Sequence, residues 1–317
     1  MEMEYRRFGR TGLQVSVAGL GTGGPSTLGQ NTGVSEAEAI RVVQRALDLG
    51  INLIDTAADY KDSEAILGRA LRAVPRDRYV IASKFMANDQ HTGALMPVEA
   101  LEKSLHRSLD RLGVDYLDVF QFHGIQASLY DQVMDRFLAE AHRWQKQGKF
   151  RFLGISENFR TDGTHRMLRQ ALTDDHFDTV MVGYNLLAPG AEHVVLPEAQ
   201  RRDVGVMVMF AVRRVLSQPA YLAQTIRELK SRGLLGQEAV PDDRPLDWLV
   251  HDHVDSIPSA AYKFVAGHPA ITSVLSGTAN LAHLETNVQA MLGLSLPAAD
   301  RTRILSLFGR IEESIGN

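Results

Sequence analysis

The sequence predicts one domain built as a (β/α)8 barrel, in which eight parallel β-strands are surrounded by helices. Short apolar runs alternate with amphipathic helical patterns, which is typical of a parallel sheet covered by helices. This alternation occurs eight times along the chain. An eight-fold β/α barrel takes roughly 250 residues plus insertions, and 317 are present. Because no segment has the composition of an interdomain linker, residues 1–317 are expected to form a single domain.

Each expected element is indicated by its own pattern. A Thr11-Gly12 turn between two short extended runs predicts an N-terminal β-hairpin that caps the barrel and leads into a first strand at 17–21. Ser35 followed by Glu38 is a capping-box pattern, and Gly50 ends the apolar stripe behind it, so a helix is expected between them. The other strands are expected at 52–55, 79–84, 116–123, 151–156, 179–184, 205–210 and 271–277, and the other helices at 63–74, 97–113, 130–147, 161–172, 197–202, 281–292 and 298–315.

A long irregular stretch, 211–256, is expected after the seventh strand. It follows the C-terminal end of that strand, which is the face on which such barrels build their active sites. Long loops in compact domains usually carry function or are mobile. We therefore expect this loop and the C-terminal helix to be additions to the basic barrel.

The bulk composition excludes several classes of protein. The chain is 44% hydrophobic with a net charge of -4 and no long basic run, so nucleic-acid binding has little support. It has no cysteine, which removes disulfides and thiolate chemistry. The N-terminus lacks the apolar core of a signal peptide, and the longest apolar run, 204–212, is too short to span a bilayer. We expect a soluble, cytoplasmic protein that does not bind membranes.

Two other enzyme classes fit the sequence less well. The stretch GLGTGG at 19–24 satisfies G-x-G-x-x-G, but a dinucleotide-binding motif of that kind opens a helix at its third glycine, and Pro25 and a polar stretch follow here. A metal-dependent hydrolase would need clustered ligands. His251 and His253 lie in the irregular stretch, so a solvated loop explains them better and no metal site is expected.

Four polar residues stand at the ends of three consecutive strands. Asp55 closes the strand at 52–55, Tyr60 follows it, Lys84 closes the next strand and His123 the one after. The ends of barrel strands meet at one rim, where Lys84 is the natural partner of a buried Asp55. A nearby ammonium lowers the pKa of a tyrosine from its ordinary value of ~10, and a neutral histidine orients a substrate oxygen. The set predicts delivery of a proton to a developing alkoxide.

These residues resemble the catalytic tetrad of the aldo-keto reductase family. The family's Asp, Tyr, Lys and His match Asp55, Tyr60, Lys84 and His123, and the resemblance runs from RRFGRTGLQVS at 6–16 to SGTANLAHLETN at 276–287. It implies a β/α barrel that transfers hydride from a nicotinamide dinucleotide to an aldehyde or ketone, or in reverse from an alcohol or aldose, without a metal. The partner would then be a small-molecule carbonyl or alcohol, with oligomeric state left open.

The resemblance also implies a set of cofactor contacts. Glu157 stands where the family often has a carboxamide-binding asparagine, Met181 where it often has a glutamine, and His283 where NADP-preferring relatives often carry an arginine. The family favours NADP, with NAD as the second possibility. The implied cofactor-binding residues are Thr22, Gly23, Ser156, Asn158, Phe210, Arg213, Gly277, Thr278, Asn280, His283 and Asn287.

A second function stays open from the sequence. Barrels that resemble aldo-keto reductases also serve as cofactor-sensing regulatory subunits, as in the β subunits of potassium channels. Such a subunit binds the cofactor with little turnover, and the presence of the four rim residues does not exclude it. Turnover of simple carbonyl compounds separates the two functions.

Overall fold

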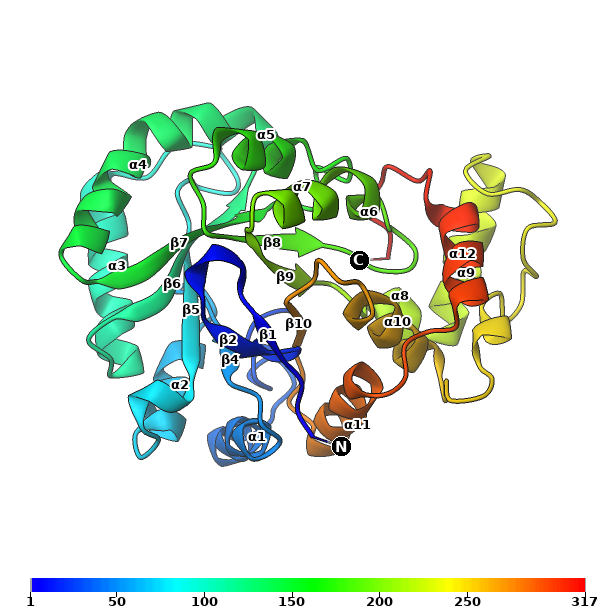
Figure 1. The fold of residues 1–317 in the computed structure, drawn as a ribbon, viewed down its shortest axis with the longest axis horizontal. Helices are drawn as coiled ribbons and strands as arrows, with labels where there is room; N and C mark the ends of the chain where they lie inside the picture. The colour runs from blue at the N-terminus through cyan, green and yellow to red at the C-terminus, as the bar shows by residue number, and fades with distance from the viewer. Residues whose placement is uncertain (1, 317) are drawn as a thin grey trace.

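The computed structural model describes residues 2–316 and contains the expected closed barrel (Figure 1). Residues 1 and 317 of the expected domain lie outside the described part. Neighbouring barrel strands are all parallel, in the order β10-β3-β4-β5-β6-β7-β8-β9. The strands are β3 (Ala18–Gly21), β4 (Leu53–Asp55), β5 (Val80–Phe85), β6 (Leu117–Ile125), β7 (Phe150–Glu157), β8 (Thr179–Gly183), β9 (Gly205–Met209) and β10 (Ser273–Ser276).

The N-terminal hairpin closes one end of the barrel. β1 (Tyr5–Arg7) pairs antiparallel with β2 (Gln14–Ser16), and Figure 1 shows this hairpin (dark blue) in front of the barrel strands. Phe8, from its turn, is fully buried and packs with residues of the barrel interior such as Leu53 and Met207. A Cβ on Gly205 would lie 2.3 Å from the Phe8 ring, so β9 begins with a glycine where the hairpin meets it. The opposite end, where the strands terminate, is left for the functional site.

Helices cover the barrel between its strands. The capping box predicted at Ser35 is present: its side chain accepts from the Glu38 amide, and the Glu38 carboxylate accepts from the Ser35 amide. The helices are α1 (Glu36–Asp48), α2 (Ser63–Leu71), α3 (Val98–Leu112), α4 (Tyr130–Lys146), α5 (Arg166–Asp174), α6 (Ala191–Val194), α7 (Leu196–Arg201), α8 (Arg214–Ser217), α9 (Pro219–Ser231), α10 (Ile257–Ala266), α11 (Leu281–Leu292) and α12 (Ala298–Phe308).

The structure corrects three expectations about elements. α5 begins at Arg166 rather than near 161, because Asp162 accepts a hydrogen bond from the Met167 amide and His165 takes a left-handed conformation (φ 57°). α12 ends at Phe308 rather than near 315. In the long stretch after the seventh strand, the helical pattern at 221–233 corresponds to α9, but the short helix α10 that follows the stretch was not predicted at all.

Membrane-spanning helices and clusters of metal ligands are both absent from the described residues. Within 2–316, no helix is both long enough and apolar enough to cross a membrane. In the same residues, no group of three or more His, Cys, Asp or Glu side chains is arranged to hold a metal ion.

Candidate active site

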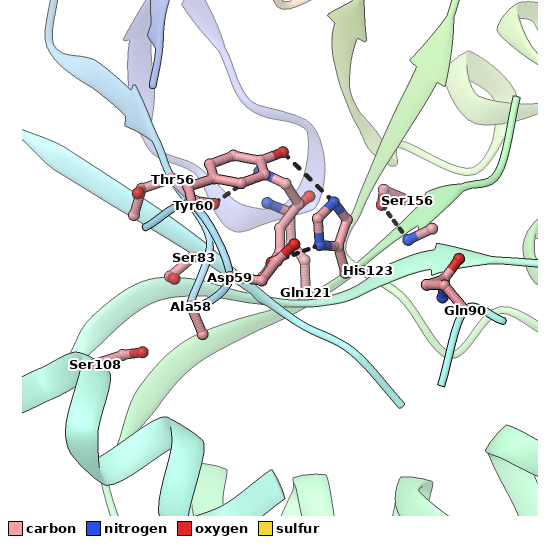
Figure 2. Close-up of polar contacts among 12 residues, drawn as sticks. Thr56, Ala58, Asp59, Tyr60, Ser83, Gln90, Ser108, Gln121, His123 and Ser156 are labelled. Atoms are coloured by element: carbon pink, nitrogen blue, oxygen red, sulfur yellow. Dashed lines mark hydrogen bonds and ion pairs between the residues drawn. The ribbon is translucent and has the colours of Figure 1, made fainter. Parts of the chain in front are cut away.

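The four predicted rim residues come together where β4, β5 and β6 end, and Figure 2 shows two of them, Tyr60 and His123. Asp55 is the last residue of β4, Lys84 lies in β5 and His123 in β6, while Tyr60 is in the loop after β4. The parallel register pairs Asp55 with Ala82, two residues before Lys84. Their side chains therefore meet on one side of the rim, as the strand ends predicted.

The expected ion pair between Lys84 and Asp55 is present and almost fully buried. The Lys84 Nζ atom lies 2.5 Å from one Asp55 oxygen and donates at 2.7 Å to the Thr56 carbonyl. Gln121 donates to the other Asp55 oxygen at 3.1 Å. Burial opposes the charge on Lys84, yet the Asp55 carboxylate raises the pKa of Lys84 above its ordinary value. The pair therefore keeps an ammonium under Tyr60, and both carboxylate oxygens are satisfied.

Tyr60 lies between this ammonium and His123. Its ring centroid is 5.0 Å from the Lys84 Nζ atom, and its hydroxyl is 3.4 Å from the His123 Nε2 atom. The ring packs against Gly23, where a Cβ would lie 2.2 Å from it, so only glycine fits there. Burial raises the pKa of Tyr60 above its ordinary value and outweighs the lowering effect of Lys84. Lys84 therefore acts in the expected direction, but burial gives the pKa of Tyr60 a net rise, and the phenol keeps its proton.

Asp59 is a rim residue that the sequence interpretation missed. Its carboxylate lies 3.1 Å from the His123 Nδ1 atom, whereas Tyr60 faces the other ring nitrogen, Nε2 (Figure 2). Burial alone would raise its pKa, but the hydrogen bond with His123 lowers the pKa of Asp59 below its ordinary value. Its position directly before Tyr60 was the one available signal, and that signal does not indicate a contact with a residue on β6.

Ser156 and Asn158 lie at the end of β7, next to the β6 side of the rim. Ser156 is buried and its hydroxyl accepts a hydrogen bond at 2.8 Å from the Gly124 amide. Asn158 is half-buried, and its backbone amide donates to the Ile125 carbonyl. Both residues join the loop after β7 to the end of β6, which places them close to the strand that carries His123.

Glu157, which stands where the family often has a carboxamide-binding asparagine, has its contacts inside the protein. Its buried carboxylate lies 2.9 Å from the His165 Nδ1 atom and accepts from the Gly183 amide at 2.8 Å. Burial raises the pKa of Glu157 in spite of this histidine. The pair fastens the loop after β7 to the end of β8. Sequence reasoning noticed Glu157 as a departure but did not find His165.

Phe210 and Arg213 follow β9 and form a cationic corner of the rim. Phe210 has a left-handed backbone (φ 65°), which is strained for an aromatic residue and frequent at functional sites. The Arg213 guanidinium lies 4.7 Å from its ring centroid and donates to the Ser314 hydroxyl at 2.6 Å. Burial, with the neighbouring Arg160, lowers the pKa of Arg213 to about 10. No carboxylate in residues 2–316 lies within ion-pair distance of Arg213, so this cation suits an anionic ligand.

The loops after β3 and β10 run side by side. A Cβ on Gly277 would lie 3.5 Å and 3.7 Å from the carbonyl oxygens of Gly21 and Gly23. Thr22, between these two glycines, is fully buried, and its hydroxyl has no hydrogen-bond partner among the described residues. A buried unpaired hydroxyl is costly, so Thr22 fits a contact with a bound group.

A cavity of about 630 Å³ opens between α1 and the start of α11. It is lined by the segment 277–282, which includes three of the implied cofactor-binding residues, and by Glu38 and Arg41 of α1. Arg41 lies 3.8 Å from Glu38. The cavity thus offers one cation and one carboxylate beside the helix terminus, and sequence reasoning had not placed Arg41 there.

The implied cofactor-binding residues between 278 and 287 also form hydrogen bonds within the protein. Asn280 caps α11 by accepting from the His283 amide at 3.1 Å, and Thr278 accepts from the Asn280 amide at 3.1 Å. Asn287 donates to the Ser276 hydroxyl at 2.9 Å. His283 and Asn287 are not among the residues that line the cavity.

Comparison with known proteins agrees with this geometry. The model of the Aldo/keto reductase family matches residues 19–307, which include all four rim residues. The chain belongs to the aldo/keto reductase family. It is therefore an oxidoreductase of a family that uses nicotinamide cofactors.

Relatives of this reductase include enzymes with different named activities. It is 37% identical over 160 residues to L-galactose dehydrogenase of Arabidopsis thaliana, a match that spans 49% of each chain. It is 26% identical over 333 aligned positions to NADH-specific methylglyoxal reductase of Escherichia coli, covering 96% of this chain and 98% of the relative. The holo form of aldo-keto reductase AKR11C1 from Bacillus halodurans has a TM-score of 0.74 at 26% identity, covering 97% of both chains.

Proposed function

We propose that this reductase transfers hydride between a nicotinamide cofactor and the carbonyl carbon of a small aldehyde or ketone, or runs the reverse oxidation. The observation that carries the proposal is the position of the Tyr60 hydroxyl, 3.4 Å from His123 at the rim and above the buried Lys84 ammonium. A proton donor at the mouth of a barrel, next to an ammonium and an imidazole, suits protonation of an oxygen that becomes an alkoxide.

Each rim residue has one role in this proposal. The bound cofactor supplies or takes up the hydride. Tyr60 gives its proton to the carbonyl oxygen, and the resulting phenolate is stabilised by Lys84. Asp55 holds Lys84 in place and charged, and His123, next to the Tyr60 hydroxyl, orients the carbonyl. Burial raises the pKa of Tyr60 and keeps the phenol protonated before the reaction. The proton leaves only as the carbonyl oxygen gains negative charge, and the phenolate that remains lies beside the Lys84 ammonium.

The cofactor is proposed to lie along the rim from β7 to the cavity at α11. Arg213, buried without a carboxylate partner in the described residues, suits the pyrophosphate. The unpaired Thr22 hydroxyl and the left-handed Phe210 suit the nicotinamide side. Ser156 and Asn158 would hold the carboxamide, and the other residues of this set would be Gly23, Gly277, Thr278, Asn280, His283 and Asn287.

We propose NADP(H) as the preferred cofactor, with NAD(H) as the alternative. Arg41, on α1, lines the cavity and supplies a cation for the 2′-phosphate of NADP. It would take the role of the arginine that NADP-preferring relatives often carry at the position of His283. Glu38 lines the same cavity, and a carboxylate at such a position suits the 2′-hydroxyl of NAD. The name of the Escherichia coli relative, an NADH-specific enzyme, also favours NAD(H).

The substrate is proposed to be a small, polar carbonyl compound or aldose. The names of the two curated relatives, a methylglyoxal reductase and a sugar dehydrogenase whose match covers only half its length, support this class. Asp59, with its side chain 41% exposed at the rim, makes the surroundings of Tyr60 hydrophilic.

The deciding experiment is titration of the protein with NADPH and with NADH, followed by turnover with methylglyoxal and simple aldoses. Binding is read from the fluorescence of the dihydronicotinamide, and turnover from its oxidation. Binding followed by turnover supports the reductase. Binding without turnover of any carbonyl favours a cofactor-sensing subunit, and failure to bind either dinucleotide contradicts the proposal.

A further inference from the structure

Asp59, His123 and Tyr60 form a continuous polar chain from the proposed acid to solvent. The Asp59 carboxylate lies 3.1 Å from the His123 Nδ1 atom, and the His123 Nε2 atom lies 3.4 Å from the Tyr60 hydroxyl. The Asp59 side chain is 41% exposed and that of His123 15%. The Tyr60 and His123 rings meet edge to face, at 80° with centroids 5.6 Å apart. Each imidazole nitrogen therefore has one partner (Figure 2).

The carboxylate determines which nitrogen of His123 keeps its proton. An ionised Asp59 only accepts hydrogen bonds, so the proton belongs on Nδ1. Nε2, which faces Tyr60, is then the nitrogen whose proton exchanges. In a neutral imidazole Nε2 accepts from the Tyr60 hydroxyl, and in an imidazolium it donates to that oxygen.

We propose that Asp59 is a positioning residue that makes His123 the proton store for Tyr60. The inference rests on the proposed carbonyl reduction. As hydride adds to the carbonyl carbon, the Tyr60 O–H proton moves to the carbonyl oxygen. The phenolate oxygen takes the Nε2 proton of the imidazolium, which becomes neutral with Nδ1–H still bonded to Asp59. Water reprotonates Nε2 after the product leaves, and Asp59 stays ionised throughout.

The charges around His123 make Asp59 necessary for this role. Tyr60 and Asp59 face it from the loop after β4. Lys84 on β5 lies behind Tyr60, and its positive charge opposes an imidazolium. Asp55 is already engaged with Lys84 and Gln121. On the β7 side, Ser156 is neutral and bonded to Gly124. Asp59 is therefore the carboxylate in direct contact with the imidazole.

The test is the rate of carbonyl reduction in Asp59→Asn, with Asp62→Asn as the matched control. Asp62 is an exposed carboxylate three residues further along, in front of α2. An amide can donate to the Nδ1 atom as well as accept from it, so Asp59→Asn no longer determines which imidazole nitrogen carries the proton. We therefore expect kcat to fall about ten-fold in Asp59→Asn, the effect of losing one charged hydrogen bond. Asp62→Asn and the charge-retaining Asp59→Glu are expected to keep the wild-type kcat.

A second readout does not depend on turnover. The ¹⁵N chemical shifts of His123 in the wild-type protein are expected to show a protonated Nδ1, and this preference is expected to weaken in Asp59→Asn. An unchanged kcat in Asp59→Asn overturns the proposal, and so does an equal loss of kcat in Asp59→Glu or a bare Nδ1 in the wild type. If the wild type reduces no carbonyl, the proposed function fails separately, and the nitrogen shifts still decide whether Asp59 positions His123.

Discussion

The two sides of the barrel rim differ in how their charges are satisfied. On the β4 to β6 side, Lys84 and Asp55 are buried and neutralise each other at 2.5 Å. On the β9 and β10 side, Arg213 is buried beside Phe210 without a carboxylate partner in the described residues, and a cavity opens at α11. The first side is electrostatically complete within the protein, whereas on the second side the Arg213 cation is proposed to meet an anionic ligand. Variants of the first side are expected to affect chemistry and stability, and variants of the second mainly ligand binding.

Tyr60→Phe gives the largest expected effect. Loss of the hydroxyl removes the proposed proton donor, and kcat is expected to fall by about 10² to 10⁴ because general acid catalysis contributes that much. The phenylalanine ring keeps the packing against Gly23, so the cofactor dissociation constant is expected to stay nearly the same. Steady-state kinetics and cofactor titration check both points. A variant that keeps most of its activity shows that Tyr60 is not the acid.

Lys84→Met tests whether Lys84 and Asp55 stabilise the protein only when both are present. Removal of the ammonium leaves Asp55 buried without its cation, which is expected to cost about 3–5 kcal/mol of unfolding free energy as well as activity. Denaturant unfolding measures the loss. The double variant Asp55→Leu/Lys84→Met is the control and is expected to recover much of that stability without recovering activity. Equal instability of the single and double variants would contradict the assigned pairing.

Arg213→Met applies the same change of charge to the second side. Since no carboxylate of the described residues is left unpaired, the unfolding free energy is expected to change by less than about 1 kcal/mol. The cofactor dissociation constant is expected to rise about ten- to hundred-fold, because a charged hydrogen bond contributes about 1.5–3 kcal/mol. Arg214→Met, at an exposed neighbouring position, is the matched control. Unchanged cofactor affinity would remove Arg213 from the binding site.

Arg41→Ala gives the smallest expected effect and sharpens the assignment of the cavity. The affinity for NADPH is expected to fall about ten-fold, the size of one exposed charge-assisted contact, while that for NADH stays the same. Glu38→Gln is the companion variant, and it is expected to weaken NADH more than NADPH. Titration of each variant with both dinucleotides is sufficient. Equal losses for the two cofactors in Arg41→Ala would show that Arg41 does not read the 2′-phosphate.

The sequence predicted the barrel and the meeting of Asp55 with Lys84 because both follow from strand order. Residues at the ends of neighbouring parallel strands must share one rim. The contact of Asp59 with His123 was not predictable in this way, since it depends on the path of the loop after β4. Lys84 lowers the pKa of Tyr60 as expected, but burial, which a pattern of residues does not report, outweighs it.

The pair of Glu157 and His165 escaped prediction for a related reason. The left-handed conformation of His165 and the cap supplied by Asp162 delay the start of α5, and this local geometry brings His165 back to β7. α10 was missed because it follows directly on a stretch without a clear helical period. The cofactor residues were named from family resemblance, and their contacts with a cofactor stay a prediction.

The hydrogen bond from Arg213 to Ser314 joins the segment after α12 to the side of the rim that carries Arg213. Ile311 and Ile315 of this segment are buried, and its backbone at Glu312 packs against Gly163. Proteolytic trimming or affinity tags in this segment would therefore disturb the guanidinium that is proposed to meet the pyrophosphate. For purification and immobilisation, fusions belong at the other terminus, beside the hairpin that seals the far end of the barrel.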